Sequence, residues 1–340
     1  MTASTQQTIS IALCTYNGSI YLPAQWQSIL EQDQLPDEVV ICDDQSTDRT
    51  VELLHQFAAQ SPFPVRIIQN SVRLGYNKNF EKALSSCTGD LIFICDQDDY
   101  WFPEKISTMS TYMINHPQTK LAFCDAWVTD EQLEEREGRF WERVRFDSHA
   151  KTRWQTGDMM EVMLDGNRVM GCASVIRKDF LGVVLPIPDS IPGYIYDGWM
   201  GLVGAACNAI QFVDQPLQLY RTHVQQQVGV REAEPQKRVR LRDRFIRHRA
   251  IKLAPLRQKQ AQLAVISRLL AQRVSDNAPG LPLLYRRLDH FTMRSCLPHD
   301  RIRRIKPVLS NLRRGNYKRY ADVAANWMAP YLAALGDMLE

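Results

Sequence analysis

The stretch Leu91-Ile92-Phe93-Ile94-Cys95 runs directly into Asp96-Gln97-Asp98-Asp99, and this junction decides the fold. A short, wholly apolar run of this length predicts a buried strand. Carboxylates that crowd together raise each other's pKa unless a cation neutralises them. Oxygen ligands in an acidic cluster suit Mg²⁺ or Mn²⁺. The junction therefore predicts a strand that opens into a divalent-metal site, and the alternative is a solvated acidic turn that caps the next helix.

Three further apolar runs in the N-terminal part of the chain also end in polar residues. They are Thr8–Leu13, Glu38–Cys42 and Val65–Ile68. Stretches typical of helices lie between the runs, at Tyr21–Glu31, Thr50–Ala59 and Asn77–Ser86. Strands that alternate with helices at this spacing predict an α/β protein with a doubly wound sheet. Because ligands of such sheets bind beyond the carboxyl ends of the strands, we expect the polar clusters to converge on one crevice.

The polar clusters after these runs resemble the successive motifs of family 2 glycosyltransferases with the GT-A fold. The clusters are Cys14–Gly18, Asp43–Asp48, Gly75–Asn79 and Asp96–Asp99. The resemblance extends from about residue 8 to about residue 230, with the motifs in the family's order and spacing. It implies a mixed sheet with a Rossmann-like nucleotide-binding half. It also implies transfer of a sugar from a nucleoside diphosphate sugar, with inversion at the anomeric carbon.

The same resemblance implies roles for individual residues that bind the sugar donor. Asp43 or Asp44 would contact the nucleobase or ribose, Asp96 the ribose, and Asp98 the metal ion. The other residues that we expect at the donor are Thr15, Tyr16, Asn17, Arg73, Lys78, Asn79 and Gln97. The alternative for Asp43, Asp44 and Asp48 is a role in the turn and cap before the helix near Thr50, and for Asp48 we prefer this alternative.

Asp197 is the candidate general base. An inverting transferase must remove a proton from the acceptor hydroxyl, and a carboxylate at a helix N-terminus, away from the diphosphate, suits that task. Asp197 stands beside Gly198 and Trp199, with an apolar helical run behind it. The resemblance makes Trp199 an aromatic wall for the acceptor, because family members carry an acid closely followed by tryptophan here. The alternatives are that Asp197 caps its helix and Trp199 packs in the core, and the next candidate bases are Asp189 and Glu161.

His223 is a further candidate metal ligand, in the segment Tyr220-Arg221-Thr222-His223. Relatives with a histidine here use it on the metal or on the diphosphate, and Asp96 is an additional candidate ligand. An ordinary surface or core role is the alternative for this histidine. Neutral imidazole suits Mn²⁺ better than Mg²⁺. The expected cofactor is therefore a divalent cation, either Mn²⁺ or Mg²⁺.

Two features narrow the expected activity to a non-processive hexosyltransferase. The Gln-x-x-Arg-Trp motif of processive synthases is absent, because no tryptophan lies between Trp199 and Trp327. No apolar run approaches the roughly 18 residues that span a membrane. We therefore expect addition of one or a few sugars to a glycan or a lipid-linked saccharide. Asp96–Trp101 together with Asp197–Trp199 resembles bacterial rhamnosyltransferases, which implies deoxythymidine diphosphate rhamnose as the donor.

Charge divides the chain near Gly229. Residues 231–340 hold 24 Lys and Arg against 9 Asp and Glu, whereas residues 1–230 hold 17 against 29. We expect a catalytic domain of residues 1–229, with a donor half at about 8–125 and an acceptor half at about 126–229, and a basic helical region of residues 230–340. Basic amphipathic helices bind anionic membrane surfaces. The alternative is that the basic region packs on the acidic domain, within one chain or across a homodimer.

Cysteine spacing and the N-terminal sequence indicate where in the cell the protein acts, and charge argues against some alternative functions. The eight cysteines show no C-x-x-C spacing, which argues against a zinc site or a disulfide framework. The first ten residues lack the layout of a signal peptide, so we expect a cytoplasmic protein, attached at most peripherally to the inner membrane face. No nucleic-acid partner is expected, because the acidic first half would oppose it. A nucleic-acid- or membrane-binding scaffold with a degenerate transferase fold is the competing hypothesis, and intact Asp96, Asp98 and Asp197 argue against it.

Overall fold

The structure is a computed structural model that describes residues 7–224, 226, 249–321 and 326–339. These residues fall into two compact units. The first lies within Met1–Glu232 and Arg273–Ala278, and the second lies within Ala233–Gln272 and Pro279–Glu340. The boundary that charge predicts at Gly229 lies outside the described residues and stays a prediction.

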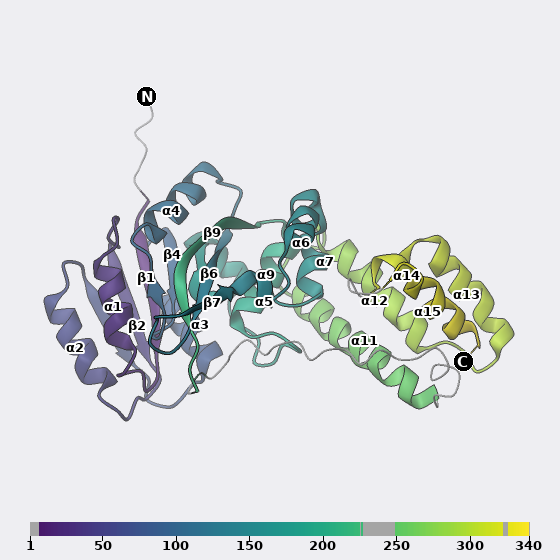
Figure 1. The fold of residues 1–340 in the computed structure, drawn as a ribbon, viewed down its shortest axis with the longest axis horizontal. Coiled ribbons are helices and arrows are strands. Elements are labelled where there is room, and N and C mark those ends of the chain that lie inside the picture. The colour runs from purple at the N-terminus through teal and green to yellow at the C-terminus, as the bar shows by residue number, and fades with distance from the viewer. Residues whose placement is uncertain (1–6, 225, 227–248, 322–325, 340) are drawn as a thin grey trace. The chain divides into compact units, whose positions relative to one another are not determined.

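A mixed sheet forms the centre of the first unit, in the purple-to-teal part of the chain (Figure 1). Its first four strands lie in the order β3-β2-β1-β4 and are parallel. They are β1 Ile9–Thr15, β2 Glu38–Asp43, β3 Val65–Gln69 and β4 Leu91–Cys95. Every residue of β1 and β4 is buried, as their apolar runs predict. The predicted α/β fold with a doubly wound sheet is therefore confirmed.

The remaining strands make the sheet mixed and fold the chain back toward the end of β4. They are β5 Tyr100–Trp101, β6 Leu121–Thr129, β7 Arg136–Arg139, β8 Ser174–Arg177 and β9 Ile210–Arg221. Strand β8 is antiparallel to both β4 and β6, whereas β9 is parallel to β6. Strand β9 also pairs with the short β5. This pairing brings the end of β9 beside the acidic residues that follow β4.

Helices connect the strands of the first unit. The longer ones are α1 Leu22–Leu30, α2 Thr50–Gln60, α3 Tyr76–Ser86, α4 Lys105–Asn115 and α9 Tyr196–Ala206. The shorter ones are α5 Phe140–Arg143, α6 Ser148–Arg153, α7 Met159–Leu164 and α8 Leu181–Val184. A π-helical turn covers Trp154–Asp158, and 3₁₀ turns cover Gly171–Ala173 and Lys178–Phe180. Strand β7 and helices α5 and α6 lie between β6 and the π-helical turn.

The second unit is helical, as predicted for the C-terminal region. Its helices are α11 Arg249–Ala271, α12 Leu281–Ser295, α13 Arg301–Arg313, α14 Asn316–Arg319 and α15 Ala329–Leu339. Helix α14 ends at Arg319, and α15 begins at Ala329. Pro330 lies in the first turn of α15, where proline is tolerated because its missing N–H is not needed. The part of the predicted basic helical region that precedes Arg249 lies outside the described residues.

This helical unit has a small core of its own. Leu297, Val308, Tyr317 and Ala334 are buried together. Asp337 is buried beside them and accepts hydrogen bonds from Arg294 Nε and the Tyr317 hydroxyl, both at 2.7 Å. Within the described ranges, no helix combines the length and the apolar character needed to cross a bilayer.

Candidate functional site

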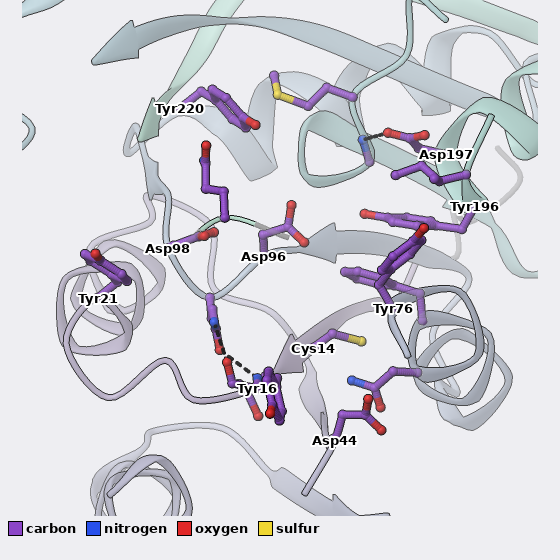
Figure 2. A pocket seen from close by; sticks show the side chains of 18 of the residues that line it. Cys14, Tyr16, Tyr21, Asp44, Tyr76, Asp96, Asp98, Tyr196, Asp197 and Tyr220 are labelled. Atoms are coloured by element: carbon purple, nitrogen blue, oxygen red, sulfur yellow. Dashed lines mark hydrogen bonds between the residues drawn. The ribbon is translucent and has the colours of Figure 1, made fainter. Parts of the chain in front are cut away.

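A cavity of about 1180 Å³ lies where β1, β2, β4 and β9 end in the first unit (Figure 2). It is the crevice that the polar clusters predict, because residues of all four clusters line it. The predicted site residues on its wall are Thr15, Tyr16, Asn17, Asp44, Arg73, Asn79, Asp96, Gln97, Asp98, Asp197 and His223. The predicted residues that do not line it are Asp43, Lys78 and Trp199.

Asp44 lies on the wall at the end of β2, and two backbone N–H groups and one side-chain amide hold its carboxylate. Its Oδ1 accepts from Leu74 N at 2.7 Å and from Asn70 Nδ2 at 2.9 Å, and its Oδ2 accepts from Gly75 N at 2.8 Å. Asn79 Oδ1 accepts from the same Asn70 amide at 2.9 Å. These bonds tie the end of β2 to the start of α3. The position of Asp44 is therefore set before any ligand arrives.

Tyr16 presents an aromatic ring in the same region of the cavity (Figure 2). Its backbone N–H donates to Gln97 Oε1 at 2.8 Å, and Gln97 Nε2 donates to the Tyr16 carbonyl at 3.0 Å. The Arg73 guanidinium lies over the ring, with Cζ 3.9 Å from the ring centre. Gly18 is needed here, because a Cβ at this position would lie 2.1 Å from Gln97 Oε1. The result is a flat, rigid surface at which a planar group can stack.

Asp43 and Lys78 are placed differently from the prediction. Asp43 is buried behind the wall, where it accepts hydrogen bonds from Thr15 Oγ1 at 2.9 Å and from Ser46 N at 2.9 Å. This is the turn role that was the alternative for Asp43. Lys78 Nζ donates to Glu81 at 3.0 Å and to the Ile187 carbonyl at 2.7 Å. The bond to Ile187 fastens α3 to the loop before α9. Neither partner of Lys78 lines the cavity.

Asp98 and His223 lie 125 positions apart in the sequence but meet in the site. The Asp98 Oδ2 and His223 Nε2 atoms are 2.9 Å apart. Arg221 fixes this approach, since its Nε donates to the Asp98 carbonyl at 2.7 Å and its backbone N–H donates to Asp99 at 3.3 Å. The Tyr21 ring packs on the imidazole, with ring centroids 4.1 Å apart. The end of β9 is thus fastened to the loop that follows β4.

The Asp98–His223 pair fits a divalent cation. The two atoms are at hydrogen-bond distance, and the same separation suits neighbouring ligands of an octahedral ion, which lie about 3 Å apart when the bonds are about 2.1 Å. A carboxylate oxygen and an imidazole nitrogen together suit Mn²⁺, and the carboxylate also suits Mg²⁺. These two residues could therefore hold the expected metal, with Asp96 available on the same wall.

Asp96 also belongs to a second group of potential ligands. Oxygen atoms of Asp96 and Asp99 and the sulfur of Cys172 lie within 4.8 Å of one another. Burial raises the pKa of the Cys172 thiol well above its ordinary value, so the thiol stays protonated and is a poor ligand for a hard cation. The Asp99 carboxylate already accepts from Gln218 Nε2 at 3.1 Å. This group therefore suits Mg²⁺ or Mn²⁺ less well than Asp98 and His223.

The electrostatics of Asp96 favour a cation in this part of the cavity. Burial raises the pKa of Asp96 well above its ordinary value, and the carboxylates of Asp98, Asp99 and Asp197 raise it further. A nearby positive charge would relieve this repulsion. Figure 2 shows Asp96 and Asp98 close together, with Asp197 farther along the cavity.

Asp197 lies on the wall in the first turn of α9. Its Oδ1 accepts from Asn167 Nδ2 at 3.0 Å and from Gly198 N at 2.5 Å, and its Oδ2 accepts from Gly171 N at 3.2 Å. Burial raises the pKa of Asp197 to about 6, although these hydrogen bonds oppose the rise. A carboxylate offers about four acceptor positions, so three donors leave Oδ2 free to accept a further proton. The group is thus a base that is ionised near neutral pH.

Trp199 does not form the aromatic wall that the resemblance implies. Its side chain is fully buried, and its indole N–H donates to the Val184 carbonyl at 2.9 Å. It packs in the core behind Asp197, which was the alternative for this tryptophan. The other candidate bases also lie off the cavity wall, because Asp189 is almost fully exposed beside Lys78 and Glu161 is fully buried in α7.

Aromatic residues that the sequence did not single out supply much of the cavity wall. They are Tyr21, Tyr76, Phe80, Phe140, Tyr194, Tyr196 and Tyr220. Tyr196 stacks on Phe80 with ring centroids 4.1 Å apart, which joins the two halves of the unit. Asn167 was also missed as a partner of Asp197. Tyr194, Tyr196 and Tyr220 lie within three positions of Asp197 or His223, and Tyr76 lies in the Gly75–Asn79 cluster, but the other residues carry no such signal in the sequence.

The comparisons with known proteins agree with this geometry. The family model for glycosyl transferase family 2 matches residues 10–182, which is half of the chain. The uncharacterized protein Rv1520 of Mycobacterium tuberculosis is 26% identical over 219 residues, which are 63% of this chain and 59% of that protein. The dTDP-rhamnosyl transferase RfbG of Shigella flexneri is 33% identical over 98 residues, which are 28% of this chain and 34% of that protein. The match thus spans about three fifths of Rv1520.

A solved structure shares the fold. The mannosyltransferase PcManGT from Pyrobaculum calidifontis, in complex with GDP-Man and Mn²⁺, superposes with a TM-score of 0.51 at 13% identity. The match covers 98% of this chain and 86% of that one. With the predicted motifs gathered on one cavity of a GT-A sheet, the chain belongs to glycosyl transferase family 2.

Proposed function

We propose that this protein is a metal-dependent, inverting glycosyltransferase that acts non-processively on a glycan or a lipid-linked saccharide. One observation carries the proposal: the Asp98–His223 pair and the Asp197 carboxylate line the same cavity. The first suits a metal-bound diphosphate, and the second suits a general base. A donor sugar that spans the two would bring its anomeric carbon between leaving group and base.

The donor nucleoside would occupy the part of the cavity lined by Tyr16 and Asp44. The Tyr16 ring would stack on the base, and the fixed Asp44 carboxylate would accept from a base N–H or a ribose hydroxyl. Asp96 would accept from the ribose. The partial likeness to a dTDP-rhamnosyl transferase supports dTDP-rhamnose as the donor.

On the acceptor side, Asp197 would take the proton of the attacking hydroxyl. The new bond forms between the acceptor oxygen and the anomeric carbon, while the bond from that carbon to the phosphate oxygen breaks. The nucleoside diphosphate leaves with the electron pair, and a divalent cation held by Asp98 and His223 would neutralise its charge. Asn167, Gly171 and Gly198 keep the Asp197 carboxylate aimed during this exchange.

The Asp98→Ala variant tests the metal and diphosphate part of the proposal. Removing this carboxylate should abolish the Mn²⁺-dependent part of nucleoside diphosphate binding in calorimetry. The matched control is Asp214→Ala, which removes an exposed aspartate paired with Lys151 and should bind as the wild type does. An unchanged Mn²⁺ dependence in Asp98→Ala would reject the metal role of this residue.

A further inference from the structure

Large apolar side chains are concentrated on the surface of two helices in the second unit. Seventeen such side chains are exposed among the described residues, and eight of them lie between Ile302 and Leu339. On α13 the spacing is i, i+3, i+7, which places them along one side of the helix. On α15 the spacing is i, i+4, i+8, with two more just before the helix. The eight are Ile302, Ile305, Leu309, Trp327, Met328, Tyr331, Leu335 and Leu339.

These two stripes are not part of the unit's core. The core uses other sides of the same helices, with Val308 of α13 and Ala334 of α15 buried together. By contrast, the exposed fraction of the side chains along the two helices runs from 36% for Leu309 to 78% for Ile302. Rows of exposed apolar groups of this kind mark interaction surfaces, because water contact with them is unfavourable.

Positive charge surrounds the α13 stripe. Residues 301–321 contain eight Arg and Lys and no Asp or Glu. Arg304 is buried and donates to the carbonyls of Pro298 and His299, so it caps the turn before α13 rather than facing outward. The other seven are exposed: Arg301, Arg303, Lys306, Arg313, Arg314, Lys318 and Arg319.

An apolar stripe beside a field of cations matches the chemistry of an anionic lipid bilayer. The apolar groups can enter the boundary between headgroups and acyl chains, while the cations remain at the level of the phosphates. The same face of a second copy would bring like charges together, which opposes self-association through it. We propose that α13 and α15 form a docking surface for an anionic membrane.

The experiment is co-sedimentation of the full chain with vesicles of phosphatidylcholine, with or without phosphatidylglycerol. The wild-type protein should bind only the anionic vesicles, and more weakly at high salt because screening shortens the reach of the charges. The variants I302S/I305S/L309S and Y331S/L335S/L339S should each bind the anionic vesicles roughly tenfold less, because they lack the apolar side chains that would enter the bilayer. The matched control I251S/Y285S removes exposed apolar groups from α11 and α12 and should bind as the wild type does.

A charge variant keeps the test decisive if a stripe variant folds poorly, which circular dichroism would reveal. The affinity of R303S/K306S for anionic vesicles should fall roughly fivefold for each cation removed, which is equivalent to about 1 kcal/mol each. R49S/R286S removes the same charge from exposed sites elsewhere and should have little effect.

Three results would overturn the proposal. The first is a wild-type protein that ignores anionic vesicles. The second is folded stripe variants that bind vesicles like the wild type and are displaced by RNA to the same extent, because the surface would then be a general polyanion site. The third is a stripe variant that converts a wild-type oligomer into a monomer in light scattering, which would make this face a contact between copies.

Discussion

Asp197 combines two opposing influences on a single carboxylate. Removal from water raises its pKa, whereas hydrogen bonds from Gly198, Gly171 and Asn167 lower it. Removal from water prevails, and the pKa rises to about 6 from the ordinary value of 3.8. A base of this strength is mostly ionised at pH 7 and still accepts a proton more readily than an exposed aspartate.

The Asp197→Asn variant should retain the fold and its affinity for the donor nucleotide. Turnover should fall by about 10²–10⁴-fold, which is the usual contribution of a positioned general base. Steady-state transfer assays with calorimetry of donor binding would measure both. Asp189→Asn is the matched control, because that aspartate is exposed and lies off the cavity wall. Transfer by Asp197→Asn near the wild-type rate would place the base elsewhere.

Activity should depend on pH through the same carboxylate. Because Asp197 must be ionised to accept a proton, kcat/KM should fall as pH drops through about 6. Asn167→Ala removes a hydrogen bond that stabilises the ionised form, so the pKa should rise and the acidic limb should move to higher pH. A pH profile of Asn167→Ala that overlays the wild-type profile would contradict this assignment.

At the scale of secondary-structure elements, the first turn of α9 is held in place by its packing on Gly171. A Cβ at residue 171 would lie 2.1 Å from the Tyr196 hydroxyl, so no larger side chain fits without moving that ring. Tyr196 in turn stacks on Phe80 of α3. The turn that carries Asp197 is therefore positioned by a glycine from one segment and an aromatic ring from another.

Gly171→Ala should displace this turn and lower the free energy of unfolding by about 1–3 kcal/mol, the usual cost of overpacking a core. Transfer activity should fall as well, because Asp197 is the next residue after Tyr196. Denaturant unfolding and activity assays would measure the two effects. Gly182→Ala is the matched control, since a Cβ there meets no atom within 4 Å. Equal behaviour of the two variants would show that the contact at Gly171 is not tight.

The strands and helices from β1 to β4 could be predicted from sequence to within two residues. Their apolar runs end sharply in polar clusters. The local sequence alone therefore indicates both where each strand ends and which residues lie at the edge of the cavity. The Asn167–Asp197 bond could not be predicted, because its residues lie 30 positions apart with no shared motif. Trp199 was misplaced because every residue of α9 is buried, which leaves no amphipathic pattern to show which side faces the cavity.

At the scale of the whole molecule, the sequence concentrates acidic residues in the first 230 positions and basic residues in the remainder. The acidic part contains the family 2 sheet and the cavity with its carboxylates. The basic part contains a separate helical unit with its own core. Donor chemistry and surface attachment are thus expected to reside in different units, so a variant in one should leave the other intact.

The central claim is that the cavity binds a nucleoside diphosphate sugar together with a divalent cation. The most direct measurement is thermal unfolding of the full chain with dTDP-, UDP- and GDP-sugars, each with Mn²⁺ or with EDTA. A ligand at 100 times its dissociation constant stabilises the folded state by roughly 2.7 kcal/mol. The account predicts that at least one of these donors raises the unfolding temperature with Mn²⁺, and that EDTA or Asp98→Ala removes the rise. No rise with any of the donors, at concentrations that saturate related enzymes, would contradict it.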